Sequence, residues 1–462
     1  MSMPSGSVTA SAAAAGDVFA DLVGQEEAVR TLRRAVAAAA RIVAGTAPAD
    51  ATPGTGTVAA RPVDQDVSSD VDLARVSSTL DGPAVEPSDA GDPELAGLVG
   101  SGAMTHAWIF TGPPGSGRSV AARAFAAALQ CERDGIGCGQ CHGCHTVLGG
   151  THADVRFVVP EGLSIGVGEM RALVLRAASA PSGGRWQAVV IEDADRLTEA
   201  AGNALLKAVE EPPPRTVFLL CTPSTHPDDI SVTIRSRCRV VPLRQPPAEA
   251  VAAVLVRRDG IAPDVASWAA AAAQGHVGRA RRLAADPEAR RRRDAVLAVP
   301  RRLTGVGACF DAASALIEAA EAEAGAAATD NDSAERAALE RALGAGGTGR
   351  GAAGAIRGAA GQLKDLERRQ KSRATRSQRD ALDRALVDLA GFYRDVLITA
   401  LRAPVDVVHT DTASLSAAAA EKWSPESTLR RLEAVLACRD AIEANVKPKI
   451  AVEAMMISLW RG

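Results

Sequence analysis

Short apolar runs alternate with longer amphipathic segments between residues 106 and 242. Three of these runs, 106–111, 188–191 and 217–222, are almost entirely apolar, which is typical of strands that are covered on both faces in a parallel sheet. Residues 118–130 and 203–210 instead carry apolar side chains at helical spacing. Strands that alternate with helices in this way predict an α/β domain built on a parallel sheet.

The second half of the chain shows a helical period and no strand pattern. Residues 247–288 are expected to form a small helical lid, and residues 289–462 an all-helical C-terminal domain. Within this domain we expect a long helix over 377–402 and a last helix over 445–460. The segment 323–360 is rich in alanine and glycine and is predicted to be loose.

Two stretches near the N-terminus lack the side chains that build a core. Residues 1–18 are predicted to be a disordered N-terminus, and residues 45–97 a disordered insertion. Both carry too few large apolar groups to offset the entropy lost on ordering. The first folded domain is therefore expected to span residues 19–246, with a turn and an amphipathic helix over 19–40 ahead of the insertion.

Composition sets limits on the class of protein. A chain of 462 residues predicts two or three domains, and its 3% aromatic content predicts cores built from small residues. The net charge of −3 excludes a global attraction to nucleic acid, so any DNA contact must be local. The sequence contains no apolar stretch long enough to span a membrane and no signal-peptide pattern, which predicts a cytoplasmic protein without membrane contact.

The first predicted strand runs directly into a glycine-rich loop and then a helix. Loops of this kind wrap backbone amides around a phosphate at a helix N-terminus. The candidate nucleotide-binding residues of the loop are Gly112, Gly115, Gly117, Arg118 and Ser119, the last as a ligand of Mg²⁺. Arg118 stands where this motif usually has lysine. Arginine is forked and bulkier than lysine, so the loop predicts a P-loop fold and argues against ordinary ATPase activity.

Two carboxylates, Glu192 and Asp193, follow the apolar run 188–191. Ligands of open α/β sheets bind outside the carboxyl ends of the strands, so both residues are candidates for the nucleotide site. The alternative is that they only cap the helix that we expect over 195–209.

Four of the eight cysteines lie within 14 residues: Cys131, Cys138, Cys141 and Cys144. Four thiolates can close a tetrahedral Zn²⁺ site, and the two-residue gaps allow neighbouring cysteines to share one ion. Such a cluster in a cytosolic chain favours metal over disulfides. We therefore predict a zinc module over 131–144, and its closed ligand set indicates a structural ion.

The predicted helix 203–210 continues as the motif NALLKAVEEPP over residues 203–213, and Ser236-Arg237-Cys238 follows the next strand. A strand with an acidic end, this motif, another strand and SRC, in that order, resemble the AAA+ subunits of bacterial clamp loaders. The resemblance is most specific over 106–238. It implies a RecA-like parallel sheet with an inserted zinc module, followed by a small helical lid and an all-α collar domain that holds subunits in a ring.

The resemblance also bears on nucleotide chemistry. A clamp-loader ATPase has Asp and then Glu where this chain has Glu192 and then Asp193, so the residue that would activate water is one methylene too short. Residues 22–25 (LVGQ) resemble the stretch that flanks the adenine. Thr222 is expected at the sensor-1 position, and Arg279 lies one place too late to be a sensor-2 ligand. Little or no intrinsic ATPase activity is therefore expected.

Arg237, expected at the end of a strand, is the residue to which the resemblance gives a catalytic role. In the family this arginine reaches across a subunit boundary to the γ-phosphate of a neighbour's ATP, where it stabilises charge on the transferred phosphoryl group. The implied partners are gamma/tau and delta subunits in a hetero-oligomeric ring, the sliding clamp and primed DNA.

Two other functions remain open on the sequence. The chain could be a gamma/tau-like motor ATPase of the same ring, against which Arg118 and the order of the two acids count. It could also be a zinc-ribbon protein that reads DNA, although no basic or aromatic cluster surrounds the cysteines. The basic run 368–376 is interpreted as a solvated face, with contact to a DNA backbone as the alternative.

Overall fold

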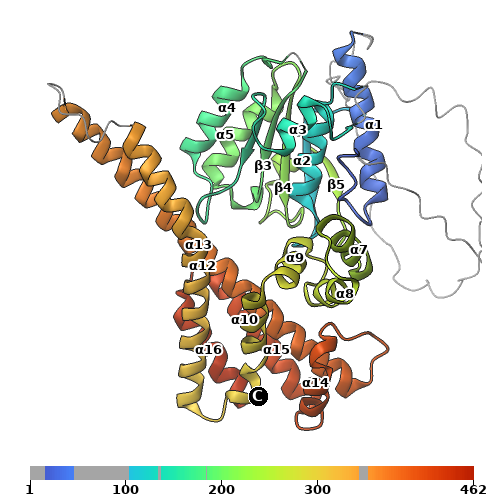
Figure 1. Cartoon of the computed structure of the whole chain (residues 1–462), viewed down its shortest axis with the longest axis vertical. Coiled ribbons are helices and arrows are strands. Elements are labelled where there is room, and N and C mark those ends of the chain that lie inside the picture. Colours follow the sequence, from blue (N-terminus) through green and yellow to red (C-terminus); the bar gives the residue numbers. More distant parts are fainter. Residues whose placement is uncertain (1–15, 46–102, 134–136, 184, 343–351) are drawn as a thin grey trace, which may run out of the picture.

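The computed structural model describes residues 16–45, 103–133, 137–183, 185–342 and 352–462. The predicted insertion over 45–97 and nearly all of the predicted N-terminal segment lie outside these ranges. Figure 1 shows a sheet domain, a small cluster of helices below it, and a larger helical domain from which a long two-helix arm projects. None of the described helices is both long enough and apolar enough to cross a membrane.

The first domain is built on a parallel sheet with helices, as predicted. Its order within the described residues is β2-β3-β4-β1-β5, and every neighbouring pair is parallel. Ile109, on the strand between β4 and β5, lies between Leu220 and Val240 in register. The strands are β1 (Ala107–Thr111), β2 (Val155–Val158), β3 (Gln187–Ile191), β4 (Thr216–Thr222) and β5 (Arg239–Pro242).

Helices cover both faces of this sheet. Because side chains alternate along a strand, Trp108 and Phe110 pack under one helical layer while Ile109 packs under the other. Trp108 meets Phe125 edge-on with ring centroids 5.0 Å apart. The first layer contains α1 (Glu26–Val43), α2 (Arg118–Leu129) and α3 (His142–Leu148), and the second contains α4 (Val167–Ala177), α5 (Glu199–Glu210) and α6 (Val232–Arg235).

The remaining helices form two bodies with separate apolar cores. The lid contains α7 (Ala248–Asp259), α8 (Pro263–Ala272) and α9 (Val277–Ala285). The collar contains α10 (Pro287–Leu297), α11 (Val299–Arg302), α12 (Val306–Ala342), α13 (Ala352–Leu401), α14 (Ala413–Ala420), α15 (Pro425–Glu443) and α16 (Pro448–Arg461). A P-loop-type sheet domain followed by two helical bodies is the order of domains that the resemblance implied.

The prediction of a loose segment over 323–360 was wrong for its described part. Helix α12 continues to Ala342, and α13 begins at Ala352, well before the long helix that was expected to start at 377. Alanine is the strongest helix former, and the two helices lie side by side along the arm in Figure 1, so each supports the other. At 50 residues, α13 is about 75 Å long.

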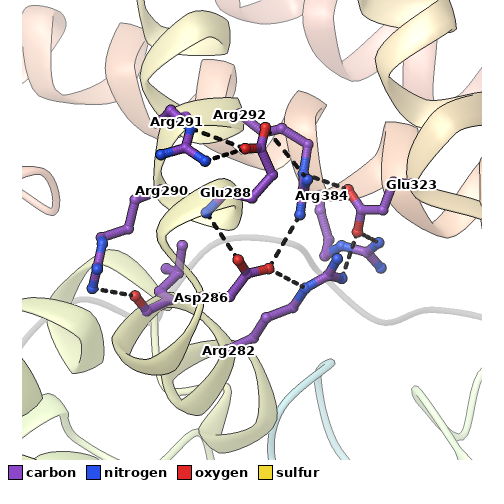
Figure 2. Close-up of polar contacts among 9 residues, drawn as sticks. Arg282, Asp286, Glu288, Arg290, Arg291, Arg292, Glu323 and Arg384 are labelled. Carbon is purple, nitrogen blue, oxygen red and sulfur yellow. Dashed lines mark hydrogen bonds and ion pairs between the residues drawn. The ribbon is translucent and has the colours of Figure 1, made fainter. Parts of the chain in front are cut away.

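An ion-pair cluster joins the lid to the collar. Figure 2 shows Glu323 of α12 facing three arginines from three other helices. Its carboxylate lies 2.5 Å from Arg282, 2.6 Å from Arg384 and 3.3 Å from Arg292. Burial opposes ionisation of Glu323, but the three guanidinium groups, led by Arg384, lower the pKa of its carboxyl group. Together with the ion pair between Arg279 and Asp388, the cluster fixes the lid against the collar.

Candidate nucleotide, metal and interface sites

The glycine-rich loop lies between β1 and α2, at the edge of the sheet where ligands of this fold bind. Gly117 caps α2 in the left-handed conformation, with φ of 88°. A Cβ at Gly115 would lie 2.8 Å from Cα of His276, so only glycine allows the lid to approach the loop this closely. The hydroxyl of Ser116 is buried without a hydrogen-bond partner among the described residues, inside the loop that would surround a phosphate.

A cavity of about 390 Å³ opens beside this loop. It brings together residues that the sequence predicted to share a site: the loop from Pro114 to Ser119 and the segment around Leu22 and Val23. Gln25 ties the two sides, since its side chain donates to the backbone oxygens of Ser116 and Arg244. The predicted adenine-flanking stretch therefore lies against the P-loop.

Arg118 is turned back onto its own loop. Its Nη1 donates to the carbonyl oxygen of Gly112 at 2.8 Å. A P-loop lysine acts as a slender point charge that reaches the phosphates, whereas this guanidinium is held by the backbone of the loop. Ser119 lines the same cavity, in the position predicted for a Mg²⁺ ligand.

The two acids after β3 are both engaged with cations. Glu192 lies 3.5 Å from Arg123 on α2. Asp193 adopts a left-handed conformation, with φ of 51°, and its carboxylate forms an ion pair with Arg376 of the collar. The alternative that these acids merely cap the next helix was wrong, because Thr198 caps α5 through the backbone amide of Ala201. That helix accordingly begins at 199 and not at 195.

Two other positions from the sequence prediction, Thr222 and Arg279, are not among the residues that line the nucleotide cavity. Thr222 is fully buried and donates to the backbone oxygen of Ser224 at 2.7 Å. Arg279 is bound to Asp388 in the collar.

Two lid arginines that line the cavity were missed. Arg281, on α9, lies 2.8 Å from Asp259, and Arg258, on α7, lies 2.7 Å from Asp21. Gly278 and Arg281 are three residues apart and so share one face of α9. That spacing was the available signal for Arg281.

The four clustered cysteines come together at the other end of α2. Their sulfur atoms all lie within 4.8 Å of one another, and the Sγ atoms of Cys131 and Cys141 are 4.0 Å apart. Zn–S bonds of about 2.3 Å in a tetrahedron place sulfurs about 3.8 Å apart, so the cluster fits a four-thiolate metal site. Because α2 has 12 residues, this cluster is about 18 Å from the P-loop along the helix.

Backbone amides already surround these sulfurs. The Sγ of Cys131 accepts from the amide of Cys138, the Sγ of Cys138 from Cys141, and the Sγ of Cys141 from Cys144, at 3.3 to 3.4 Å. Burial opposes ionisation of Cys138, but amides of Gln140 and Cys141 lower its pKa to about 7. Such amides stabilise thiolates as metal ligands and orient them. Gly143 is required here because a Cβ would lie 2.2 Å from the oxygen of Gln130.

Arg237 lies on the surface in the short connection between α6 and β5, and not at the end of a strand as predicted. Its Nη2 is 2.7 Å from a carboxylate oxygen of Glu210, and its Nη1 donates to the backbone oxygen of Thr233 at 2.9 Å and to Ser236 at 3.3 Å. The side chain is 39% exposed. A guanidinium has five N–H groups, so these three contacts leave at least two for a ligand.

The basic run 368–376 divides into two parts on α13. Arg368 is 72% exposed and pairs with Asp365 on its own helix, as a solvated face predicts. Arg373 instead pairs with Asp332 and Glu335 on the facing helix, and Arg376 with Asp193. The expectation of a solvated face was therefore wrong for these two arginines, which hold the arm together and attach it to the sheet domain.

Comparisons with known proteins agree with this geometry. Residues 93–247 match the family model described as DNA polymerase III, delta subunit. The delta' subunit of DNA polymerase III from Escherichia coli (strain K12) is 33% identical over 195 residues, which are 41% of this chain and 58% of that protein. The gamma/tau subunit from Mycobacterium tuberculosis (strain ATCC 25618 / H37Rv) is 33% identical over 180 residues, which are 38% of this chain and 31% of that protein.

The relatives are thus delta' and gamma/tau subunits of DNA polymerase III, and the predicted resemblance to clamp-loader subunits is confirmed over this part of the chain. The match spans about a third of the gamma/tau protein and rather more than half of the delta' protein. Among solved structures, a gamma subunit-related protein from Thermotoga maritima covers 77% of this chain and 94% of its own length, with 15% identity and a TM-score of 0.34.

Proposed function

We propose that this chain is a delta'-like subunit of a bacterial DNA polymerase III clamp loader. In this function it helps a ring of gamma/tau and delta subunits to load the sliding clamp onto primed DNA in the cytoplasm. The observation that carries the proposal is a P-loop, in a domain similar to delta' subunits, whose Arg118 is bonded to the loop itself. Such a domain has the architecture of an ATPase motor but lacks the P-loop lysine that contacts the phosphates.

The nucleotide site supports a subunit without ATPase activity of its own. The loop residues Gly112, Gly115, Gly117 and Ser119 would hold phosphate and Mg²⁺ if nucleotide enters. Hydrolysis, however, requires a cation on the phosphates and a carboxylate that orients water. Arg118 is directed to the oxygen of Gly112, and Asp193 is both short and paired with Arg376.

Arg237 is proposed to act on a neighbouring subunit's ATP. Its side chain is partly exposed, has N–H groups beyond those used in its three contacts, and lies at the surface between α6 and β5. An arginine supplied in trans neutralises charge that develops on the transferred phosphoryl group, and in GTPases it raises the rate by about 10³–10⁵. Arg237 is therefore the catalytic residue that this chain would contribute to the ring.

The four-cysteine cluster is proposed to hold a structural Zn²⁺. Cys131, Cys138, Cys141 and Cys144 complete a closed set of four ligands, which leaves no position for water or substrate. All four are buried and distant from the P-loop. The ion would tie the C-terminal end of α2 to α3, and its binding would contribute to folding.

A gamma/tau-like motor is the second candidate, because gamma/tau relatives match at 33–36% identity. The two functions differ in the site of ATP hydrolysis. A delta'-like subunit acts on ATP bound to a neighbouring subunit, whereas a motor hydrolyses ATP in its own P-loop. A reconstituted ring containing Arg237→Ala, assayed for ATP turnover with clamp and primed DNA, tests the proposal. We expect an intact ring with reduced turnover, and wild-type turnover would show that Arg237 has no role in trans. Turnover by the isolated wild-type chain would favour the motor.

A further inference from the structure

We infer that Glu210 is a positioning residue for Arg237 and holds its guanidinium in the pose from which it reaches a neighbour's phosphate. This inference rests on the function proposed above. Glu210 is the last residue of α5, and its Oε1 lies 2.7 Å from Nη2 of Arg237. The two residues come from different elements, 27 positions apart in the sequence, so the contact is not a by-product of one helix.

Glu210 and the residues around Arg237 fix the guanidinium from two sides. Thr233 and Ser236 bind Nη1, and Glu210 binds Nη2. Without the carboxylate, only the two contacts at Nη1 would hold the end of this long and half-exposed side chain, and Nη2 would be free to move about them. Immobilising a long side chain before its ligand arrives removes part of the entropy cost of the later contact. The remaining N–H groups stay available for phosphate.

The position of Glu210 is poor for helix stability, which argues that the carboxylate serves something other than the helix. It lies at the C-terminal end of α5, where the helix dipole is negative, and Glu211 follows it directly. A carboxylate in that place is unfavourable for the helix. Glu210 therefore gives a variant that should fold normally, since removing its charge relieves repulsion with the helix end and with Glu211.

Helix α5 is also the element that carries the carboxylate bound to Arg237. It begins six residues after Asp193, the acid that pairs with Arg376, and ends at the residue that holds Arg237. Gly202 on α5 lies against Ile234 of α6, which packs the helix onto the segment before Arg237. The carboxylate that holds the arginine is thus carried by a helix and not by a loop.

The experiment is a double-mutant cycle in the reconstituted ring with gamma/tau-type and delta-type subunits, clamp and primed DNA. The variants are Glu210→Gln, Arg237→Ala and the double variant. Glu210→Gln should lower the turnover number of the ring roughly two- to fivefold, the range that an exposed ion pair supports, with KM for ATP unchanged. In the Arg237→Ala background, Glu210→Gln should change nothing further.

Glu211→Gln is the matched control, because it removes the same charge from the same helix end and Glu211 has no contact with Arg237 in the structure. It should leave turnover at the wild-type value. If Arg237→Ala lowers turnover while Glu210→Gln does not, the positioning role is wrong and the proposed function stands. An increase with Glu210→Gln would mean that the carboxylate restrains the arginine, which also overturns the inference. If Arg237→Ala does not change turnover, both the positioning role of Glu210 and the proposed role of Arg237 in trans are wrong.

Discussion

Arg376 on α13 forms an ion pair with Asp193, which lies 183 positions earlier at the carboxyl end of β3. The same guanidinium donates to the backbone oxygen of Pro160, in the loop after β2. Nearby, a Cβ on Gly162 would lie 2.3 Å from the hydroxyl oxygen of Ser372, so the arm helix touches the sheet domain closely. One contact therefore joins two domains and occupies the carboxylate that the resemblance assigns to the water-activating position.

The first prediction concerns ATP hydrolysis by the isolated chain. The wild-type protein should hydrolyse ATP at background, and Arg118→Lys alone should not create activity, because Asp193 remains short and paired with Arg376. A steady-state phosphate-release assay measures this. Turnover on the order of 1 per second or more, in either protein, would contradict the proposal and identify Asp193 as a competent base.

The second prediction concerns the stability of the domain contact. Arg376→Ala should lower the free energy of unfolding by about 1–3 kcal/mol, because it leaves the half-buried carboxylate of Asp193 and the oxygen of Pro160 without their donor. Arg368→Ala is the control on the same helix, and its exposed pair with Asp365 should contribute less than about 1 kcal/mol. Urea denaturation gives both values. An effect of Arg376→Ala no larger than that of Arg368→Ala would show that the contact adds no more stability than an exposed ion pair.

Local patterns in the sequence predicted much of this structure. Strands β1, β3 and β4 were predictable because both of their faces are buried, so they appear as plain apolar runs. The cysteine cluster was predictable because the spacing of its members already brings four sulfurs together.

The remaining features depend on contacts over long sequence distances. Nothing near Arg376 indicates that it will meet Asp193, and nothing near Arg118 indicates that it will fold back onto Gly112. The arm was missed for a related reason. Its alanine-rich sequence lacks a strong apolar stripe, and each helix is supported by the other, which a single segment does not reveal.

The third prediction concerns metal. The purified protein should contain about one Zn²⁺, and Cys144→Ser should lower both the metal content and the thermal midpoint, since metal binding contributes folding energy. Elemental analysis and thermal unfolding measure these quantities. Cys309→Ser is the control, because Cys309 is a buried cysteine of the collar outside the cluster. A metal-free wild-type protein, or an unchanged midpoint after chelation, would contradict the assignment.

The fourth prediction concerns pH and arises at the junction of lid and collar, where His409 is fully buried. Arg293 can only donate hydrogen bonds, so its contact of 3.1 Å with Nδ1 requires that nitrogen to be the acceptor, and Nε2–H then donates to the oxygen of Asp388 at 3.3 Å. Burial, followed by Arg293, lowers the pKa of His409, although Asp388 and Asp395 oppose the shift. Asp411 completes the set of charges, since it forms two hydrogen bonds with Arg293.

A histidine whose pKa is lower in the folded state binds fewer protons there than in the unfolded chain, so the free energy of unfolding rises with pH across the interval between the two values. Stability should therefore fall as the pH decreases below the ordinary histidine value of 6.5. Denaturation midpoints of the wild type at about pH 7.5 and about pH 5.5 should show this decrease. In His409→Asn, whose side-chain oxygen can still accept from Arg293 and cannot titrate, the decrease should be smaller. His226→Asn is the control, because that side chain is 67% exposed, and it should retain the wild-type pH dependence. If His409→Asn retains the full dependence, protonation of His409 does not cause the loss of stability and the prediction is wrong.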